Sequence, residues 1–339
     1  MKILSKPKGN AEEYGRWSVN PYIGCPHGCL YCYLKSGPSG GYLGQPKAVL
    51  KKGIVSEDHA YHLAMAEILE NREQIIRDGG LFMTFTSDPL AADTRDLMLR
   101  IVGSCIGYAT TPKEQVIPVM LLTKNADFCG YNVGLFPTKT QLQGMHPWLS
   151  YFGLIRPDVL TDRLAIGWTL TGHDGLEPNA SPNAERIAVM AWLSRAGYRT
   201  WASIEPVIDF DSSFRMIKQA LDAGCEHFKI GLMTKNTKVC RHGFTLGGKT
   251  FEPYNVGQLI TFVKNVMKLT DGRATVYWKL SVEDFLEGTD KKHPIRIYNR
   301  IQTMNEDATY GMTAREYLSQ WPHSVQKDWS IFAPSPSVQ

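Results

Sequence analysis

The sequence of 339 residues carries a net charge of +4 and is 43% hydrophobic and 21% charged, which is the composition of an ordinary globular protein. No run of Lys and Arg indicates nucleic acid as a partner, and no apolar stretch approaches the roughly 18 residues that cross a membrane. The first residues show no signal-peptide pattern, and the seven cysteines fit a reducing compartment. We therefore expect a cytoplasmic protein with one large domain or two modest ones and with no membrane contact.

Short apolar strands alternate with amphipathic helices along the chain. Strands are predicted at residues 18–24, 81–86, 116–123, 164–171, 199–205, 227–232 and 275–280. Helices are predicted at residues 58–77, 93–106, 184–196, 212–223 and 256–269. This alternation is typical of parallel βαβ units, and six or seven such units predict an α/β fold built as a full or partial (β/α) barrel. In such barrels the functional residues lie on the loops that follow the strands.

The segments around this repeating part are irregular. Residues 1–17 are polar and are expected to wrap the mouth of the barrel or to fray, and residues 18–282 form the barrel itself. Residues 126–160 are rich in Gly, Pro and aromatic residues and are too long for a simple loop, so we expect an insertion over the active-site face. Residues 283–339 are expected to form a small C-terminal cap with a disordered tail.

Three cysteines, Cys25, Cys29 and Cys32, follow the first predicted strand with the spacing C-x₃-C-x₂-C. A disulfide would leave one thiol over, and a tetrahedral zinc ion would need a fourth ligand. His27 could be that ligand, although it is too close to the cysteines for the usual zinc spacing. Iron–sulfur clusters are held by thiolates, usually four, so three thiolates would leave one iron open to a small molecule. The spacing therefore predicts a catalytic iron–sulfur site, with a structural zinc site as the alternative.

The segment Gly-Cys-Pro-His-Gly-Cys-Leu-Tyr-Cys-Tyr-Leu at residues 24–34 resembles the signature of the radical S-adenosylmethionine (SAM) enzymes, and within them the spore-photoproduct-lyase-like branch. The resemblance implies a partial (β/α)₆ barrel and an oxygen-sensitive [4Fe-4S] cluster on the three cysteines, whose unique iron binds the amino and carboxylate groups of SAM. It also implies an external electron donor of the flavodoxin or ferredoxin type. Tyr31, just before the last cysteine, would pack near the adenine of SAM, and Tyr33 matches a tyrosine implicated in hydrogen transfer.

Polar residues close several of the predicted strands, and in a barrel they would meet around a cofactor. Hydroxyl groups and a lysine suit a zwitterionic amino acid, because they supply acceptors for its ammonium group and a cation for its carboxylate. The resembling branch has Thr-Ser-Asp after its second strand and Thr-Lys after its third, which implies that Ser87 contacts SAM and that Lys124 binds its carboxylate. The cofactor contacts that we expect from these strand ends are Thr86, Ser87, Lys124, Thr169 and Thr171.

Glu205 ends the fifth predicted strand, where a barrel interior would make an unpaired carboxylate unfavourable. It is expected either to act in catalysis, by hydrogen bonding to SAM or to the substrate, or to form an internal ion pair with Lys229 or Lys279. Tyr33 is the second catalytic candidate, and its alternative role is to pack beside the cluster.

The resemblance implies that SAM is cleaved reductively to methionine and a 5′-deoxyadenosyl radical, which abstracts a hydrogen atom from a substrate. One departure separates this chain from the lyases that repair thymine dimers, because Phe85 occupies the position of their hydrogen-donating cysteine. We therefore expect this chain to share the cofactor chemistry of the resembling branch, but not the substrate of the lyases. The substrate class stays open between a small molecule or peptide and DNA or RNA, and the reaction class between lyase, transferase and oxidoreductase. A zinc-binding module without catalysis is the remaining alternative.

Overall fold

The computed structural model describes residues 2–35, 38–107, 111–127, 163–233, 243–287, 289–290, 293–294 and 313–325. In these residues the central element is a nine-stranded sheet in the order β1-β2-β5-β6-β7-β8-β9-β12-β15. β1 is antiparallel to β2, and every other neighbouring pair in this sheet is parallel. The strands are β1 (Leu4–Ser5), β2 (Ser18–Val19), β5 (Leu81–Met83), β6 (Val119–Thr123), β7 (Leu164–Thr169), β8 (Arg199–Val207), β9 (His227–Leu232), β12 (Thr275–Trp278) and β15 (Ser324–Val325). The α/β class predicted from the sequence is confirmed.

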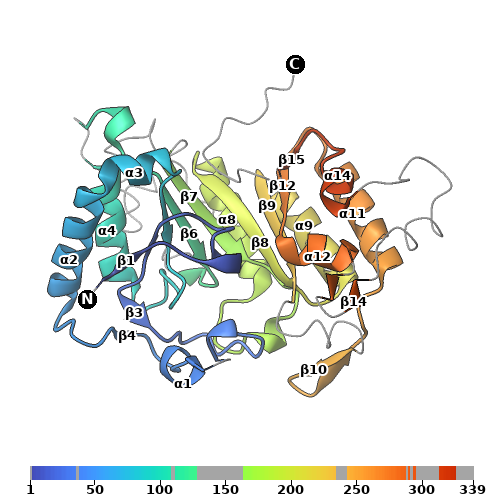
Figure 1. Cartoon of the computed structure of the whole chain (residues 1–339), viewed down its shortest axis with the longest axis horizontal. Coiled ribbons are helices and arrows are strands. Elements are labelled where there is room, and N and C mark those ends of the chain that lie inside the picture. The colour runs from blue at the N-terminus through green and yellow to red at the C-terminus, as the bar shows by residue number, and fades with distance from the viewer. Residues whose placement is uncertain are drawn as a thin grey trace.

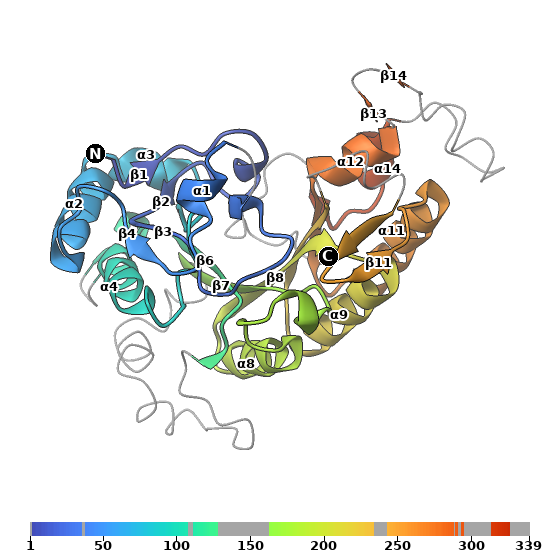
Figure 2. The same cartoon turned by 90° about the horizontal axis from the view of Figure 1, so that it is seen from below.

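Helices cover the outer side of this sheet (Figure 1). In Figure 2, α4, α8, α9 and α11 follow one another along that side, whereas the N-terminal segment lies on the opposite side. The helices are α1 (Gly40–Leu43), α2 (Glu57–Glu70), α3 (Arg72–Arg77), α4 (Arg95–Ile106), α8 (Asn183–Arg195), α9 (Phe210–Asp222), α11 (Val256–Thr270), α12 (Leu280–Glu287) and α14 (Ala314–Leu318). Short antiparallel pairs join β3 (Tyr22–Ile23) to β4 (Val49–Leu50), β10 (Phe244–Leu246) to β11 (Lys249–Phe251), and β13 (Thr289–Asp290) to β14 (His293–Pro294).

Capping side chains determine where several helices begin. Ser56, Asp209 and Asn255 precede α2, α9 and α11, and each accepts a hydrogen bond from an amide of the first turn. Such caps satisfy amide groups that the first turn leaves without a partner in the helix. The helix predicted at residues 58–77 is interrupted at Asn71, which separates α2 from α3.

The sheet separates two apolar clusters. The larger cluster joins strands to helices. The smaller cluster lies on the inner face and consists of Tyr14, Phe82, Met120, Ala165 and Trp201. Its strand members come one each from β5, β6, β7 and β8, because alternate residues of a strand point to opposite faces. Gly167 makes room for this packing, since a Cβ atom there would lie 2.2 Å from the Trp201 ring.

The N-terminal segment crosses the inner face of the sheet. The Tyr14 ring lies 5.2 Å from the Phe82 ring of β5, and its hydroxyl lies 3.0 Å from the Ser203 hydroxyl of β8. The Glu13 carboxylate accepts a hydrogen bond from the N–H of Leu280, beyond β12, at 2.8 Å. The segment that was expected to wrap the barrel mouth or to fray therefore takes part in the inner packing.

The C-terminal residues extend the main sheet. The predicted boundary between residues 282 and 283 falls inside α12, and β15 pairs with β12 in parallel. The predicted insertion at residues 126–160 lies outside the described residues apart from 126 and 127, and so does the predicted disordered tail. None of the described helices combines the length and the apolar character that a membrane span requires.

Candidate functional site

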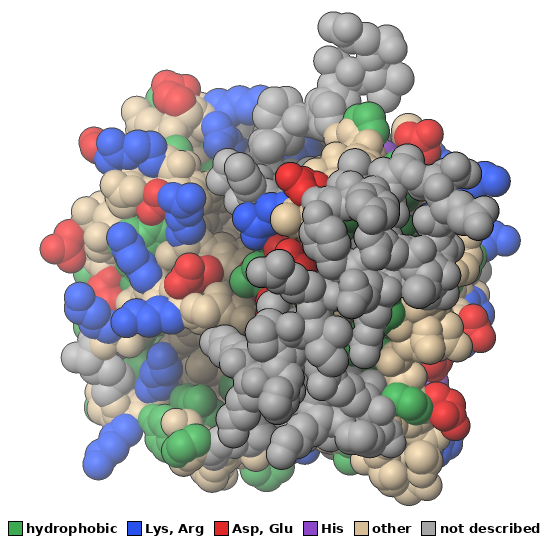
Figure 3. Space-filling model, turned by 45° about the vertical axis from the view of Figure 1, so that its right-hand side comes forward, with side chains coloured by type: hydrophobic (Ala, Val, Ile, Leu, Met, Phe, Trp, Pro, Cys, Tyr) green, Lys and Arg blue, Asp and Glu red, His purple; other side chains and the backbone are tan. Residues whose placement is uncertain are grey.

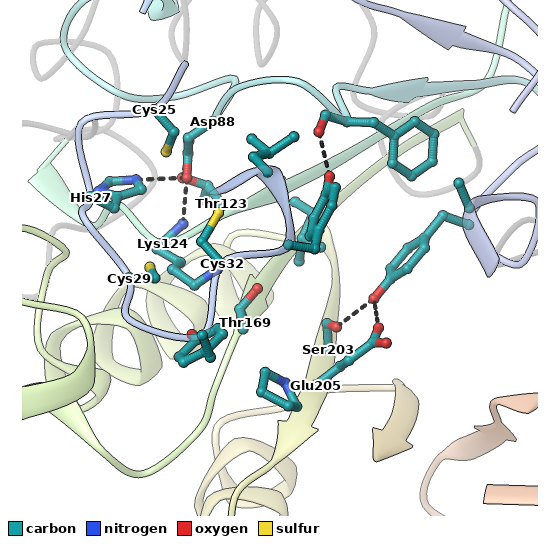
Figure 4. Close-up of a pocket in the computed structure, with 18 of the residues that line it drawn as sticks. Cys25, His27, Cys29, Cys32, Asp88, Thr123, Lys124, Thr169, Ser203 and Glu205 are labelled. Atoms are coloured by element: carbon teal, nitrogen blue, oxygen red, sulfur yellow. Dashed lines mark hydrogen bonds and ion pairs between the residues drawn. The ribbon is translucent and has the colours of Figure 1, made fainter. Parts of the chain in front are cut away.

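A cavity of about 430 Å³ opens at the carboxyl ends of the parallel strands. Residues at the ends of β5, β6, β7, β8 and β9 line it, because parallel strands bring their carboxyl ends to one edge of the sheet. Figure 4 shows two groups of polar residues in it. We call them the cysteine end (Cys25, Cys29, Cys32, Ser87, Asp88 and Lys124) and the Glu205 end (Tyr14, Ser203, Glu205 and Lys279). Of the predicted site residues, those that line this cavity are Cys25, Cys29, Tyr31, Cys32, Tyr33, Ser87, Lys124, Thr169 and Glu205.

Backbone contacts hold the cysteine loop in place. The N–H of Cys25 donates to a carbonyl of the segment before β4 at 3.0 Å, and the N–H of Leu30 donates to the carbonyl of Leu176 at 3.0 Å. Gly24 enters the loop with φ +82°, and a Cβ atom there would lie 2.2 Å from the carbonyl oxygen of Lys47. Only glycine fits that position, so the residue before the first cysteine is fixed by backbone geometry.

The three thiols share one wall of the cavity, and no disulfide joins them. Burial raises the pKa of the Cys25 thiol to about 12 and also raises the pKa of the Cys29 thiol, so metal binding there would release protons. In the part of the chain that the structure describes, no three His, Cys, Asp or Glu side chains are grouped as ligands of a single metal ion. Thiolates are ligands of iron–sulfur clusters and of zinc, so the donor set fits either group.

His27 is engaged through both ring nitrogens. Its Nε2 donates to the Asp88 carboxylate at 2.8 Å, and its Nδ1 lies 3.2 Å from the carbonyl oxygen of Asn179. The ring is buried. His27 therefore anchors the cysteine loop. Both of its ring nitrogens, one of which would have to bind a zinc ion, are engaged in these contacts.

The Asp88 carboxylate connects the loop after β5 to the end of β6. It accepts hydrogen bonds from the Thr123 hydroxyl at 2.7 Å, from the Lys124 N–H at 2.8 Å and from the Leu90 N–H at 2.9 Å. Burial is the largest influence and raises the pKa of this carboxyl, but the charge of His27 and the hydrogen bonds outweigh it and lower the pKa to about 2. Asp88 is thus an ionised link between the cysteine loop and the two strand ends. Sequence reasoning noted the Thr-Ser-Asp motif but gave Asp88 no role.

Lys124 and Tyr31 stand side by side in the cavity wall. The Lys124 Nζ lies 5.7 Å from the centre of the Tyr31 ring. Burial lowers the pKa of Lys124, but Cys29 and Glu177 raise it more, so the net shift is upward and the ammonium form is favoured. The Tyr31 hydroxyl donates to the Glu177 carboxylate, which fixes the ring.

A buried ion pair supports this wall from behind. Glu177 and Arg186 are 2.7 Å apart, and both side chains are fully buried. Arg186 also donates to the carbonyl oxygens of Ser181 at 2.6 Å and Thr169 at 2.8 Å. Removing one partner of such a pair would leave an uncompensated buried charge, so the pair holds the loop after β7 in one conformation.

The four predicted hydroxyl contacts divide into two groups. Ser87 and Thr169 line the cavity, and the buried Ser87 hydroxyl has no hydrogen-bond partner within the described ranges. Thr86 donates its hydroxyl to the carbonyl of Tyr22. Thr171 is fully buried, and its hydroxyl accepts from a backbone N–H two residues on at 3.3 Å. The structure thus places Thr86 and Thr171 outside the cavity lining, in local structural contacts.

Aromatic side chains form the wall between the two ends. Tyr33 is 57% exposed, and its hydroxyl donates to the carbonyl of Phe85. The Phe85 ring stacks on Phe82 with ring centres 4.5 Å apart. The position at which the resembling lyases carry a cysteine is therefore part of an aromatic surface in this protein.

Glu205 forms the ion pair that was one of its two predicted roles, and it also faces the cavity. Its two oxygens lie 2.7 and 2.8 Å from the Nζ of Lys279, and Oε2 accepts from the Tyr14 hydroxyl. Sequence reasoning named Lys279 only as an ion-pair partner and missed Tyr14. Tyr14 carries no motif that could have identified it, and it lies 191 residues from Glu205 in the sequence.

Comparisons with known proteins give a likeness in chain arrangement alone. No protein-family model matches the sequence, and no curated protein is similar to it. Two crystal structures of Streptococcus suis SuiB, one of them bound to S-adenosylmethionine, each align with a TM-score of 0.45, at 11% and 10% sequence identity. The alignments cover 81% and 89% of this chain and 52% and 54% of the SuiB chains, so this chain spans about half the length of SuiB.

Proposed function

We propose that this protein is a radical SAM enzyme with a partial (β/α)₆ barrel, in which Cys25, Cys29 and Cys32 hold a [4Fe-4S] cluster. The observation that carries the proposal is a single cavity in which three thiols lie near a lysine and a serine hydroxyl that has no partner in the described chain. When bound, the cluster supplies the electron that cleaves SAM reductively, and the resulting radical abstracts a hydrogen atom from the substrate.

The wall beside the cysteines binds SAM in this proposal. Lys124 holds the carboxylate of SAM through a charge-assisted hydrogen bond, and Ser87 and Thr169 offer hydroxyl groups to its polar atoms. Tyr31, which is fixed by Glu177, presents its ring to the adenine.

Asp88 and His27 hold this wall and the cysteine loop in place relative to each other. Asp88 accepts from the N–H of Lys124 and from the His27 ring, both at 2.8 Å. The loop that carries the cluster ligands is thereby tied to the strand end that carries the SAM-binding lysine. Phe85 and Tyr33 line the same cavity.

This chemistry determines the compartment and the electron donor that we propose for the enzyme. We propose an oxygen-sensitive cytoplasmic enzyme that is reduced by an external donor of the flavodoxin or ferredoxin type. On the face shown in Figure 3, Lys and Arg side chains stand among Asp and Glu side chains. The net charge of +4 does not require nucleic acid as the substrate, so we place a small molecule first and nucleic acid second.

The test is anaerobic reconstitution of the full chain with iron and sulfide, followed by dithionite and SAM, with 5′-deoxyadenosine measured by chromatography. We expect 5′-deoxyadenosine from the wild type and a loss on the order of a hundredfold in Cys29→Ala, because a cluster ligand is removed. Cys105→Ala is the matched control, since Cys105 is buried in the core away from the cavity. Zinc bound in place of an iron cluster would contradict the proposal, and so would full activity in Cys29→Ala.

A further inference from the structure

The Glu205 end of the cavity holds two carboxylates around one lysine. The Lys279 Nζ lies 2.7 Å from Glu205 Oε1 and 3.3 Å from Glu13 Oε2. The side chains of Lys279 and Glu13 are 3% and 5% exposed, whereas the Glu205 side chain is 19% exposed and lines the cavity. Lys279 and Glu205 both line the cavity, and Glu205 is the most exposed charged member of this group.

A second lysine lies nearby, but its charge is disfavoured. Lys229 is fully buried, and its Nζ lies 4.0 Å from the centre of the Tyr14 ring and 4.8 Å from that of Tyr277. Burial, and after it the neighbouring Lys279, lowers the pKa of Lys229 well below its ordinary value, although Glu13 and Glu205 oppose the shift. Burial therefore disfavours the charged form of Lys229 beside the two carboxylates.

Among the residues that the structure describes, the contacts of the Glu205 carboxylate leave capacity for another donor. A carboxylate offers about four lone-pair sites, and the two contacts with Lys279 and the one with Tyr14 account for three. The backbone leaves space for this arrangement at Gly231, where a Cβ atom would lie 2.8 Å from the Lys279 side chain and 3.1 Å from Glu205.

Apolar side chains line the cavity that Glu205 faces. The cavity lining includes Phe82, Phe85, Leu122, Leu232 and Met233. Aliphatic side chains favour an apolar ligand body, and aromatic faces attract cations. A ligand that matches both features has an apolar body and a positively charged nitrogen.

We propose that Glu205 binds the ammonium group of the substrate, an organic amine whose apolar body lies against these aromatic and aliphatic side chains. The assignment rests on the proposed function, because it takes the cysteine end with Lys124 as the place of SAM. The substrate ammonium supplies a second cation for Glu13 and Glu205, and a carboxylate in a desolvated site is stabilised by such a partner.

Two probes with the same body and opposite charge test the assignment. Binding of 2-phenylethylamine and of 3-phenylpropanoate to the reconstituted full chain is measured by isothermal titration calorimetry with saturating SAM present. We expect the amine to bind about tenfold more tightly than the carboxylate, and Glu205→Gln to remove that preference. Glu73→Gln, an exposed carboxylate on α3, is the matched control and keeps the preference.

A second variant keeps the test decisive if Glu205→Gln does not fold. Tyr14→Phe removes a hydroxyl that donates to Glu205 and keeps the ring, so amine binding is expected to be at least as tight as in the wild type. Weaker amine binding in Tyr14→Phe would overturn the proposal. Equal binding of the two probes by the wild type would do so as well, as would an unchanged preference in a Glu205→Gln chain that retains its iron.

Competition between the amine and SAM would also overturn the proposal, because it would put the amine at the cysteine end. The proposed function is judged separately, by the iron content and the 5′-deoxyadenosine formation of the same wild-type preparation. A wild type that assembles no cluster defeats the proposed function, whereas a wild type that cleaves SAM and shows no amine preference defeats only the assignment of Glu205.

Discussion

The two ends of the cavity differ in how their polar groups are partnered. At the cysteine end, the buried Ser87 hydroxyl has no partner among the described residues, and Lys124 faces the ring of Tyr31. At the Glu205 end, the carboxylate is already bound by Lys279 and receives a hydrogen bond from Tyr14. A ligand at the cysteine end can satisfy the Ser87 hydroxyl, whereas a ligand at the Glu205 end joins a network that is already formed.

This difference has a consequence for substitutions. Buried polar groups without partners are unfavourable unless a ligand satisfies them, so a change of Ser87 should act mainly on ligand binding. Charges that are paired in the protein contribute to the fold as well, so a change of Asp88 should act on stability. The following substitutions test this difference, in order of decreasing effect.

Lys124→Ala is expected to weaken SAM binding by about ten- to a hundredfold, because a charge-assisted hydrogen bond contributes roughly 1.5–3 kcal/mol. The affinity is measured by calorimetry on the anaerobic reconstituted chain, and the iron content should equal that of the wild type. Lys52→Ala, an exposed lysine outside the cavity lining, is the control. Wild-type SAM affinity in Lys124→Ala would remove this residue from the site.

Asp88→Asn is expected to change the pH dependence of stability. The pKa of Asp88 in the folded chain, about 2, lies below the ordinary value of 3.8, so the folded state binds fewer protons than the unfolded state. The stabilisation is fully present above about pH 4 and is lost as the pH falls toward 2, and it amounts to about 2 kcal/mol. Urea unfolding of the metal-free chain should show that loss in the wild type and a flatter profile in Asp88→Asn. Identical profiles would show that Asp88 is not the ionised link described above.

Ser87→Ala is expected to weaken SAM binding by about fivefold, since a hydrogen bond between uncharged groups contributes roughly 1 kcal/mol. Ser213→Ala is a matched control, because Ser213 is also buried without a hydrogen-bond partner in the described chain but lies on α9, away from the cavity. Calorimetry with SAM distinguishes the two. Equal effects of both substitutions would mean that the Ser87 hydroxyl does not face the ligand.

The cysteine end could be predicted from the sequence because its parts are local. The three cysteines lie within eight residues, and Ser87 and Lys124 directly follow apolar runs that form β5 and β6. Parallel strands then bring these loops to one edge, whatever the details of packing. The strands β6 to β9 and the helices α4, α8, α9 and α11 were predicted for the same reason, because each has its own apolar pattern.

The Glu205 end could not be predicted in full, because it is assembled from distant residues. Glu205 and Lys279 are 74 residues apart, and Tyr14 reaches Glu205 only because the N-terminal segment crosses the sheet. Thr171 was expected among the cofactor contacts together with Thr169, but β7 ends at Thr169 and Thr171 does not line the cavity. The hairpin of β10 and β11 was not predicted, since its short strands are largely exposed and lack a clear apolar pattern.

Electron paramagnetic resonance of the reconstituted, dithionite-reduced chain, recorded before and after addition of SAM, tests the central claim most directly. If three cysteines hold the cluster and SAM binds at its remaining iron, the signal of the reduced cluster changes on addition of SAM. A cluster signal that SAM leaves unchanged would contradict the account, and so would a chain that binds zinc and gives no signal.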